Sequence, residues 1–163
     1  MMGRALWVAG LCLLVAACGF QLRGTVDLPD ALTVVRVEAP DTNSQFVRAL
    51  NQRLVAAGAR VVDEVDASRL IIVDERLTNE PLAFGGDARV REFGLTFEVR
   101  YEVRDAAGEL LLDSQVVLVT RSYEFDEQAI LAASREQDNL ATELRQMAVE
   151  RVLASLSALG SAR

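Results

Sequence analysis

The most regular pattern in the chain is an alternation of apolar and polar residues over Glu92–Arg104. One side of the alternation is apolar: Phe93, Leu95, Phe97, Val99, Tyr101 and Val103. The other side is mostly charged: Glu92, Thr96, Glu98, Arg100, Glu102 and Arg104. A period of two predicts a long β-strand in a sheet that is packed on one face and wet on the other, as is common in antiparallel sheets.

The residues after this strand predict a hairpin. Asp105–Gly108 has the composition of a turn, so we expect Glu109–Phe125 to return as the partner strand. Val116–Val119 is apolar at consecutive positions, which favours burial on both faces. The returning strand is therefore expected to be more central in the sheet.

Two earlier segments also predict strands. Leu32–Glu38 is rich in β-branched residues and is followed by Pro40. Leu70–Leu77 is a second such run, which weakens at Pro81. Phe84–Asp87 then predicts the turn that precedes the long strand.

A helical period lies between these two strands. Thr42 and Gln45 fit a capping box with Thr42 as the N-cap, and Gly58 suits the position just after the helix. The intervening apolar residues recur on one helix face: Phe46, Val47, Leu50, Leu54 and Val55. This spacing predicts an amphipathic helix of about four turns.

A second helical period closes the chain. Asp126 is a candidate cap, Ser134–Asp138 a candidate break after a short first helix, and Gly160 the expected end. The apolar stripe of the main helix consists of Leu140, Leu144, Met147, Ala148, Val152, Leu156 and Leu159.

The order of elements is strand, helix, three strands, helix (β-α-β-β-β-α). We expect an α+β fold, a two-layer sandwich in which two helices cover one face of a four-stranded, mostly antiparallel sheet. No repeat or linker divides the mature chain, so residues 31–160 are expected to form a single domain.

The first 18 residues predict export and lipid attachment. Arg4 is followed by 13 uncharged residues, Ala5–Ala17, a length that suits a signal peptide better than a membrane span of about 20 residues. Val15-Ala16-Ala17-Cys18 resembles the lipobox of bacterial lipoproteins. That resemblance implies cleavage of residues 1–17, acylation of Cys18 with chains such as palmitate, and a lipidated tether over residues 18–30.

An ordinary secretory signal with a cysteine there by chance is the alternative. Gly19, rather than aspartate, follows Cys18, which by resemblance to enterobacterial lipoproteins favours the outer membrane. The mature chain would hold no second cysteine and hence no intrachain disulfide, because Cys12 is removed with the signal.

The composition of the chain argues against one class of function. The chain after Cys18 holds 16 arginines against 24 acidic residues, a net charge of −8, which argues against nucleic-acid binding. Every basic residue is an arginine, and there is no lysine. Arginine suits phosphate and carboxylate groups, but a GC-rich genome, which favours arginine codons, also explains this usage.

Catalytic chemistry is not indicated. The chain has no histidine, which removes the commonest general base and metal ligand, and we expect no cofactor and no metal. No nucleotide-binding, zinc or hydrolase motif is present. Glu98 and Glu102 could form an acid pair, but they alternate with Arg100 and Arg104, which favours a solvated charged face over an active site. We therefore expect that the chain is not an enzyme.

Several short motifs together resemble the LPS-assembly lipoprotein LptE family of Gram-negative bacteria. The start Cys18-Gly19-Phe20-Gln21-Leu22-Arg23-Gly24 is similar to that family's start, as are Leu28-Pro29, Arg121-Ser122-Tyr123 and Glu136-Gln137-Asp138. The order of elements also agrees with the family's fold. The resemblance covers nearly all of the mature chain.

This resemblance implies an outer-membrane lipoprotein that faces the periplasm. Family members sit as a plug in the large β-barrel LptD, help it assemble, and bind lipopolysaccharide for export to the cell surface. The lumen of such a barrel is polar, so the mixed-charge strand face would suit burial there.

The resemblance also implies lipopolysaccharide-binding residues, because arginine suits phosphate. The family's basic positions fall here on Gly85 and Ala133, and the nearest arginines are Arg89, Arg91 and Arg135. These three are the predicted ligand-binding residues; the alternative is that they are ordinary surface arginines. The alternative function is an auxiliary outer-membrane lipoprotein of another lipid-transport system.

Overall fold

A computed structural model describes residues 28–161 except residues 85, 87–89 and 126–128. Cys18, the signal peptide, most of the tether, Arg89 and the candidate cap Asp126 therefore lie outside the described residues. Within them no helix is long and apolar enough to cross a membrane.

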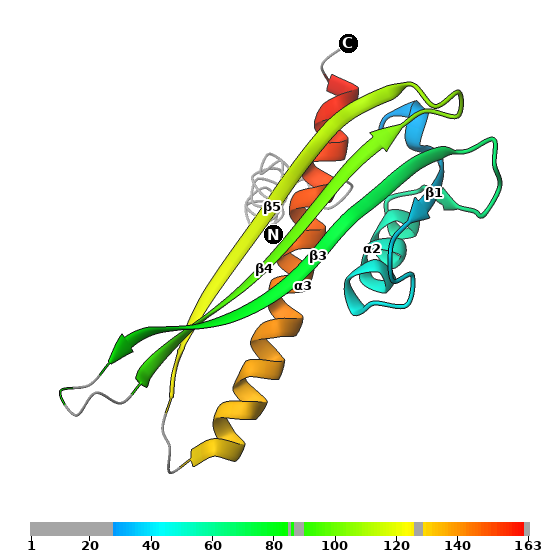
Figure 1. The fold of residues 1–163 in the computed structure, drawn as a ribbon. Coiled ribbons are helices and arrows are strands. Elements are labelled where there is room, and N and C mark those ends of the chain that lie inside the picture. The colour runs from blue at the N-terminus through cyan, green and yellow to red at the C-terminus, as the bar shows by residue number, and fades with distance from the viewer. Residues whose placement is uncertain (1–27, 85, 87–89, 126–128, 162–163) are drawn as a thin grey trace, which may run out of the picture.

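A five-stranded sheet and two long helices make up the fold (Figure 1). In chain order the elements are η1 Asp30–Leu32, β1 Val34–Glu38, α2 Gln45–Ala56, β2 Arg60–Val61, β3 Ser68–Phe84, β4 Val90–Arg104, β5 Leu110–Glu124 and α3 Ile130–Ser161. The strand order in the sheet is β2-β1-β3-β4-β5. The predicted α+β class and the mostly antiparallel sheet are confirmed.

The strand count differs by one. β2 is only two residues long, Arg60–Val61, and pairs in parallel with β1 after the chain returns through α2. Two residues cannot display a period of two, so the sequence gives no signal for this strand. β1 is also parallel to β3, whereas β3, β4 and β5 form an antiparallel meander.

The position predicted for the last strand was wrong. β5 lies at the edge of the sheet, not at its centre. Its apolar run is not buried on both sides: Val119 is 2% exposed, but Val116 and Leu118 are 53% and 50% exposed. The run is apolar on a face that no other described element covers.

The alternation along β4 was predicted correctly. Its helix-facing side chains Leu95, Phe97, Val99, Tyr101 and Val103 are almost fully buried. Phe97 contacts both helices, because the Phe46 ring of α2 lies 5.4 Å from its own ring and the Arg145 guanidinium of α3 lies 5.8 Å from it. Both helices therefore pack on the same face of the sheet, as expected.

The cap of α2 differs from the prediction. Ser44, not Thr42, is the N-cap, and its Oγ accepts a 3.1 Å hydrogen bond from the Val47 amide. The helix consequently starts at Gln45 and has 12 residues, about three turns rather than four. Gly58 just beyond it has φ +92°, which confirms its expected role at the helix end.

The expected break in the last helix is absent. α3 is continuous over 32 residues, and Ser134–Asp138 lies inside it. That segment holds no glycine or proline, so nothing in it prevents helical geometry. Gly160 does not end the helix either; it lies in the last turn, where a Cβ would come within 3.3 Å of the Pro29 side chain. The bare glycine thus lets the start of the domain pack on the end of α3.

Candidate functional site

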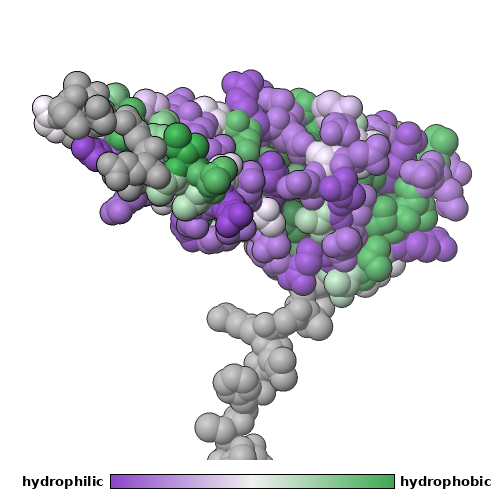
Figure 2. Space-filling model, turned by 90° about the horizontal axis from the view of Figure 1, so that it is seen from below, coloured by the Kyte–Doolittle hydropathy of each residue, from purple (hydrophilic) through white to green (hydrophobic). Residues whose placement is uncertain are grey.

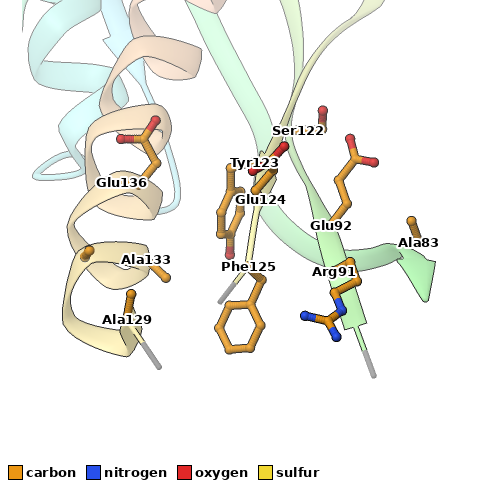
Figure 3. A pocket seen from close by; sticks show the side chains of 11 residues that line it. Ala83, Arg91, Glu92, Ser122, Tyr123, Glu124, Phe125, Ala129, Ala133 and Glu136 are labelled. Atoms are coloured by element: carbon orange, nitrogen blue, oxygen red, sulfur yellow. The ribbon is translucent and has the colours of Figure 1, made fainter. Parts of the chain in front are cut away.

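An open groove of about 890 Å³ lies where α3 diverges from the sheet. Figure 3 shows its two sides, the ends of β4 and β5 on one side and the first turns of α3 on the other. The lining residues are Ala83, Arg91, Glu92, Ser122, Tyr123, Glu124, Phe125, Ala129, Ala132, Ala133 and Glu136. Apart from Glu136, the residues on the helical side are alanines, and their small side chains leave the space open.

Aromatic rings form the sheet side of the groove. Tyr123 stacks on Phe93 with ring centroids 5.8 Å apart, and Phe125 meets Phe93 edge-on at 5.2 Å. These are geometries that aromatic pairs prefer, so the three rings stabilise one another. Phe93 is only partly buried, unlike the other helix-facing residues of β4, because α3 no longer covers the strand at this level.

The Tyr123 hydroxyl connects the aromatic side of the groove to the neighbouring strand and helix. It donates to Gln137 Oε1 on α3 at 3.2 Å and accepts from Asn79 Nδ2 on β3 at 3.0 Å. One hydroxyl therefore links β3, β5 and α3 at the point where the helix and the sheet begin to separate. These hydrogen bonds hold the inner end of the groove, where α3 and the sheet are still in contact.

The charges around the groove are mixed. Arg91 on β4 points toward the space between the strands and α3, whereas Glu92 points away from it (Figure 3). Glu124 and Glu136 are exposed and complete the charged lining. The site therefore combines one arginine with carboxylates around an apolar wall.

The predicted ligand-binding residues are only partly brought together. Arg91 lines the groove, and Arg135 lies in the second turn of α3 as an exposed residue next to Glu136, but is not among the lining residues. Arg89 lies outside the described residues.

Exposed apolar side chains surround this end of the molecule. Leu82 and Phe84 at the end of β3 are 56% and 63% exposed, and Ile130 and Leu131 at the start of α3 are 62% and 80% exposed. Figure 2, which views the molecule from this end, shows hydrophobic surface along the narrow projecting part. Sequence reasoning missed these four residues, although Ile130 and Leu131 visibly precede the apolar stripe of α3.

Within the part of the chain that the structure describes, no helix lies over the other face of the long meander, which is the mixed-charge face predicted from the alternation. Arg100 and Glu98 lie 3.8 Å apart on β4, and Arg76 and Asp74 lie 3.5 Å apart on β3. Thr96 and Thr120 are cross-strand neighbours whose hydroxyls lie 3.0 Å apart. We call this surface, formed by the outward side chains of β3, β4 and β5, the open sheet face.

Comparison with known proteins identifies the family. The family model described as "LptE: Lipopolysaccharide-assembly" matches residues 32–156, more than half of the chain. The chain belongs to the LptE family. It is 26% identical over 153 residues to the LPS-assembly lipoprotein LptE of Pectobacterium atrosepticum, which covers 91% of this chain and 82% of the relative. A relative with the same name from Photorhabdus laumondii is 27% identical over 151 residues, 90% of this chain and 81% of the relative.

Solved structures agree with this membership. A lipoprotein B of Nitrosomonas europaea, solved by NMR, has a TM-score of 0.75 at 28% identity and covers 88% of this chain and 94% of its own. A rare lipoprotein B of Shewanella oneidensis has a TM-score of 0.70 at 24% identity, covering 79% of this chain and 97% of its own, and shows the same fold.

Family membership confirms that the chain is a lipopolysaccharide-assembly lipoprotein and not an enzyme. Among the described residues no cluster of acidic or sulfur ligands could hold a metal ion. The two surface features of this LptE-family domain are the groove, which Arg91 and aromatic rings line, and the open sheet face.

Proposed function

We propose that this chain is an outer-membrane lipoprotein, anchored through Cys18, that docks inside the LptD barrel, helps it assemble, and binds lipopolysaccharide for export to the cell surface. The observation that carries the proposal is the open sheet face. No helix among the described residues covers this face of the three longest strands, and the face carries paired charges and hydroxyls.

Such a face suits the inside of a large barrel. Lumen walls of wide outer-membrane barrels are polar, so a docked surface must offer hydrogen-bonding and charged groups of both signs. The open sheet face offers both: Arg76 and Arg100 alternate with Asp74 and Glu98 on adjacent strands. Val116 and Leu118 add exposed apolar contact area along its β5 margin.

The groove is the proposed place for lipopolysaccharide. Its lipid A carries phosphates and acyl chains, and the groove combines Arg91 with aromatic rings and alanines. Arginine binds phosphate with two parallel hydrogen bonds. Arg135, in the second turn of α3, is proposed to add positive charge near the groove, and Arg89 is proposed as a further phosphate-binding residue.

Attachment at Cys18 keeps the domain next to its barrel. Two or three acyl chains give a stable anchor where a single chain does not. An anchored plug has a high local concentration at the periplasmic mouth of the barrel, which favours docking without requiring tight contacts.

Co-purification tests the proposal. The tagged full-length lipoprotein, extracted in detergent from its own cells, should bring down a barrel protein of roughly 16 or more strands, identified by mass spectrometry. Arg100→Glu combined with Arg76→Glu should reduce the recovered barrel, because it reverses both arginine charges that alternate with Asp74 and Glu98 on the open sheet face. The control Arg60→Glu changes an exposed arginine on β2, at the opposite edge of the sheet and outside the three strands that form that face, and should leave recovery unchanged.

Failure of the wild-type protein to recover a barrel would contradict the proposal. Recovery of a different lipid-transport complex would instead assign the chain to an auxiliary role in that system. Equal loss with Arg60→Glu would show that charge alone, and not the open sheet face, governs recovery.

A further inference from the structure

β5 is a 15-residue strand at the edge of the sheet. A long edge strand exposes unpaired backbone groups, to which the strand of another chain can add. The other edge, β2, is two residues long and offers little for pairing. Without protection, β5 would therefore be the edge at which a second chain could extend the sheet.

The backbone direction along β5 follows from one hydrogen bond at its end. The Phe125 amide donates to the Arg91 carbonyl at 2.9 Å. Hydrogen-bonded and non-hydrogen-bonded pairs alternate along an antiparallel ladder, so the even-numbered residues from Glu124 back to Val116 direct their backbone groups away from β4. The carbonyl of Leu118 therefore points outward from the edge.

Arg151 of α3 hydrogen-bonds to that outward carbonyl. Its Nη1 donates to the Leu118 oxygen at 2.7 Å, a charge-assisted bond across the margin of the sheet. An incoming strand would have to displace this guanidinium before its own amide could reach the same oxygen.

A bulge protects the edge further along. Tyr101 pairs with Gln115 and Val103 with Leu112, so Asp113 and Ser114 are accommodated opposite a single residue of β4. The Asp113 carboxylate accepts from the Ser114 amide at 2.7 Å, and the Gln115 side chain donates to the Asp113 carbonyl at 3.1 Å. Side chains of the strand thus bond the backbone at the bulge, where the irregular geometry also interrupts the regular ladder that an added strand would need.

We propose that Asp113, Gln115 and Arg151, the β5 edge cap, close the outer edge of β5 to strand addition. A second copy of this chain, or any chain with an unpaired strand, then cannot extend the sheet at β5. The domain meets β-rich partners through side chains of its faces and not by backbone pairing. This inference does not depend on which partner the proposed function names.

Self-association of the full lipoprotein in detergent tests it. The variant Asp113→Ala/Gln115→Ala/Arg151→Ala should raise the dimer association constant at least tenfold over wild type in sedimentation velocity. Arg151→Ala alone should give a smaller rise, and Arg151→Lys, which keeps a donor, should stay close to wild type. Arg76→Ala is the matched control, since it removes an exposed arginine from β3, inside the sheet.

Hydrogen exchange identifies the surface used. In the dimer, the outward amides of Val116, Leu118 and Thr120 should become protected at least tenfold against exchange, whereas those of β2 should not change. A variant with wild-type circular dichroism that stays monomeric would overturn the proposal. So would a dimer without protection at these amides, or equal dimerisation of Arg76→Ala.

Discussion

The Ser44 hydroxyl donates a 3.1 Å hydrogen bond to the Glu75 carboxylate, and so joins the first turn of α2 to the middle of β3. The same Ser44 oxygen accepts from the Val47 amide and caps the helix. Burial raises the pKa of Glu75 above its usual 4.5, although the Ser44 hydrogen bond and the charge of Arg145 act in the opposite direction. The helix cap thus rests on a carboxylate that is harder to ionise than a surface glutamate.

Replacing this carboxylate with an amide should stabilise the domain at neutral pH. An acid whose pKa is raised by folding lowers stability where it is ionised in both states, and this cost disappears once both states are protonated. Glu75→Gln keeps an acceptor for Ser44 but carries no charge. Its free energy of unfolding should exceed that of wild type at pH 7, and the difference should shrink as pH falls through the raised pKa and vanish below about 4.5.

Urea unfolding of both proteins at several pH values measures this difference. Glu109→Gln, at an exposed position, corrects for the titration of the rest of the chain. A Glu75→Gln difference that grows as pH falls would reverse the sign of the argument and contradict it.

The end of α2 should be sensitive to a single methyl group. Gly58 has φ +92°, and an added Cβ would meet no atom within 4 Å, so the cost of Gly58→Ala is conformational alone. We expect a loss of about 1–2 kcal/mol, the usual cost of a left-handed conformation for a residue with a Cβ. Gly86→Ala is the control, since that site also has open space but no positive φ, and it should change stability little. Equal losses at both sites would refute this explanation.

Removing one oxygen from Tyr123 should loosen the inner end of the groove. Tyr123→Phe keeps the ring stack on Phe93 but deprives Asn79 and Gln137 of their shared partner. We expect a loss of about 1–3 kcal/mol, as for a part-buried hydrogen bond whose partners stay behind. Thr120→Val removes an exposed hydroxyl next to Thr96 and should cost less. Thermal unfolding of the two variants compares them directly, and a greater loss in Thr120→Val would be inconsistent with a structural role for the Tyr123 hydroxyl.

Lipopolysaccharide binding should depend on the three arginines proposed to bind it. Changing Arg89, Arg91 and Arg135 together to Ala removes these cations, and affinity should fall at least tenfold, since one lost charge-assisted bond is worth about 1.5–3 kcal/mol. Fluorescence titration of the full-length protein with labelled lipopolysaccharide measures this. Arg36→Ala, on β1, is the control. Unchanged binding by a folded triple variant would show that these arginines are not the lipopolysaccharide site. The proposed docking in the barrel, which co-purification tests, would not be affected.

The fold was predictable where the pattern was long. Thirteen residues of strict alternation fixed both the strand β4 and the face that packs, and the stripe of α3 fixed the main helix. The cap of α2 was not predictable, because Thr42 and Ser44 both have the right side chain. The choice between them depends on Glu75, 31 residues away along the chain.

The edge position of β5 could not be predicted from the sequence for a related reason. Val116 and Leu118 have the composition of buried residues, but their exposure is set by the strand order and by which face the helices cover. The groove was foreseen only through Arg91. Its aromatic wall depends on α3 leaving the sheet near Tyr123, and nothing local in the sequence of α3 marks the point of separation.

The contact between Pro29 and Gly160 fixes the end of the domain from which the tether departs. α3 has 32 residues, and the 27 residues from Ala133 to Gly160 place the groove about 40 Å from that contact. The ten peptide units between Cys18 and Leu28 span at most about 36 Å even when fully extended. If Cys18 carries the proposed acyl chains, the membrane anchor and the proposed ligand site therefore belong to opposite ends of α3, and the length of that helix separates them.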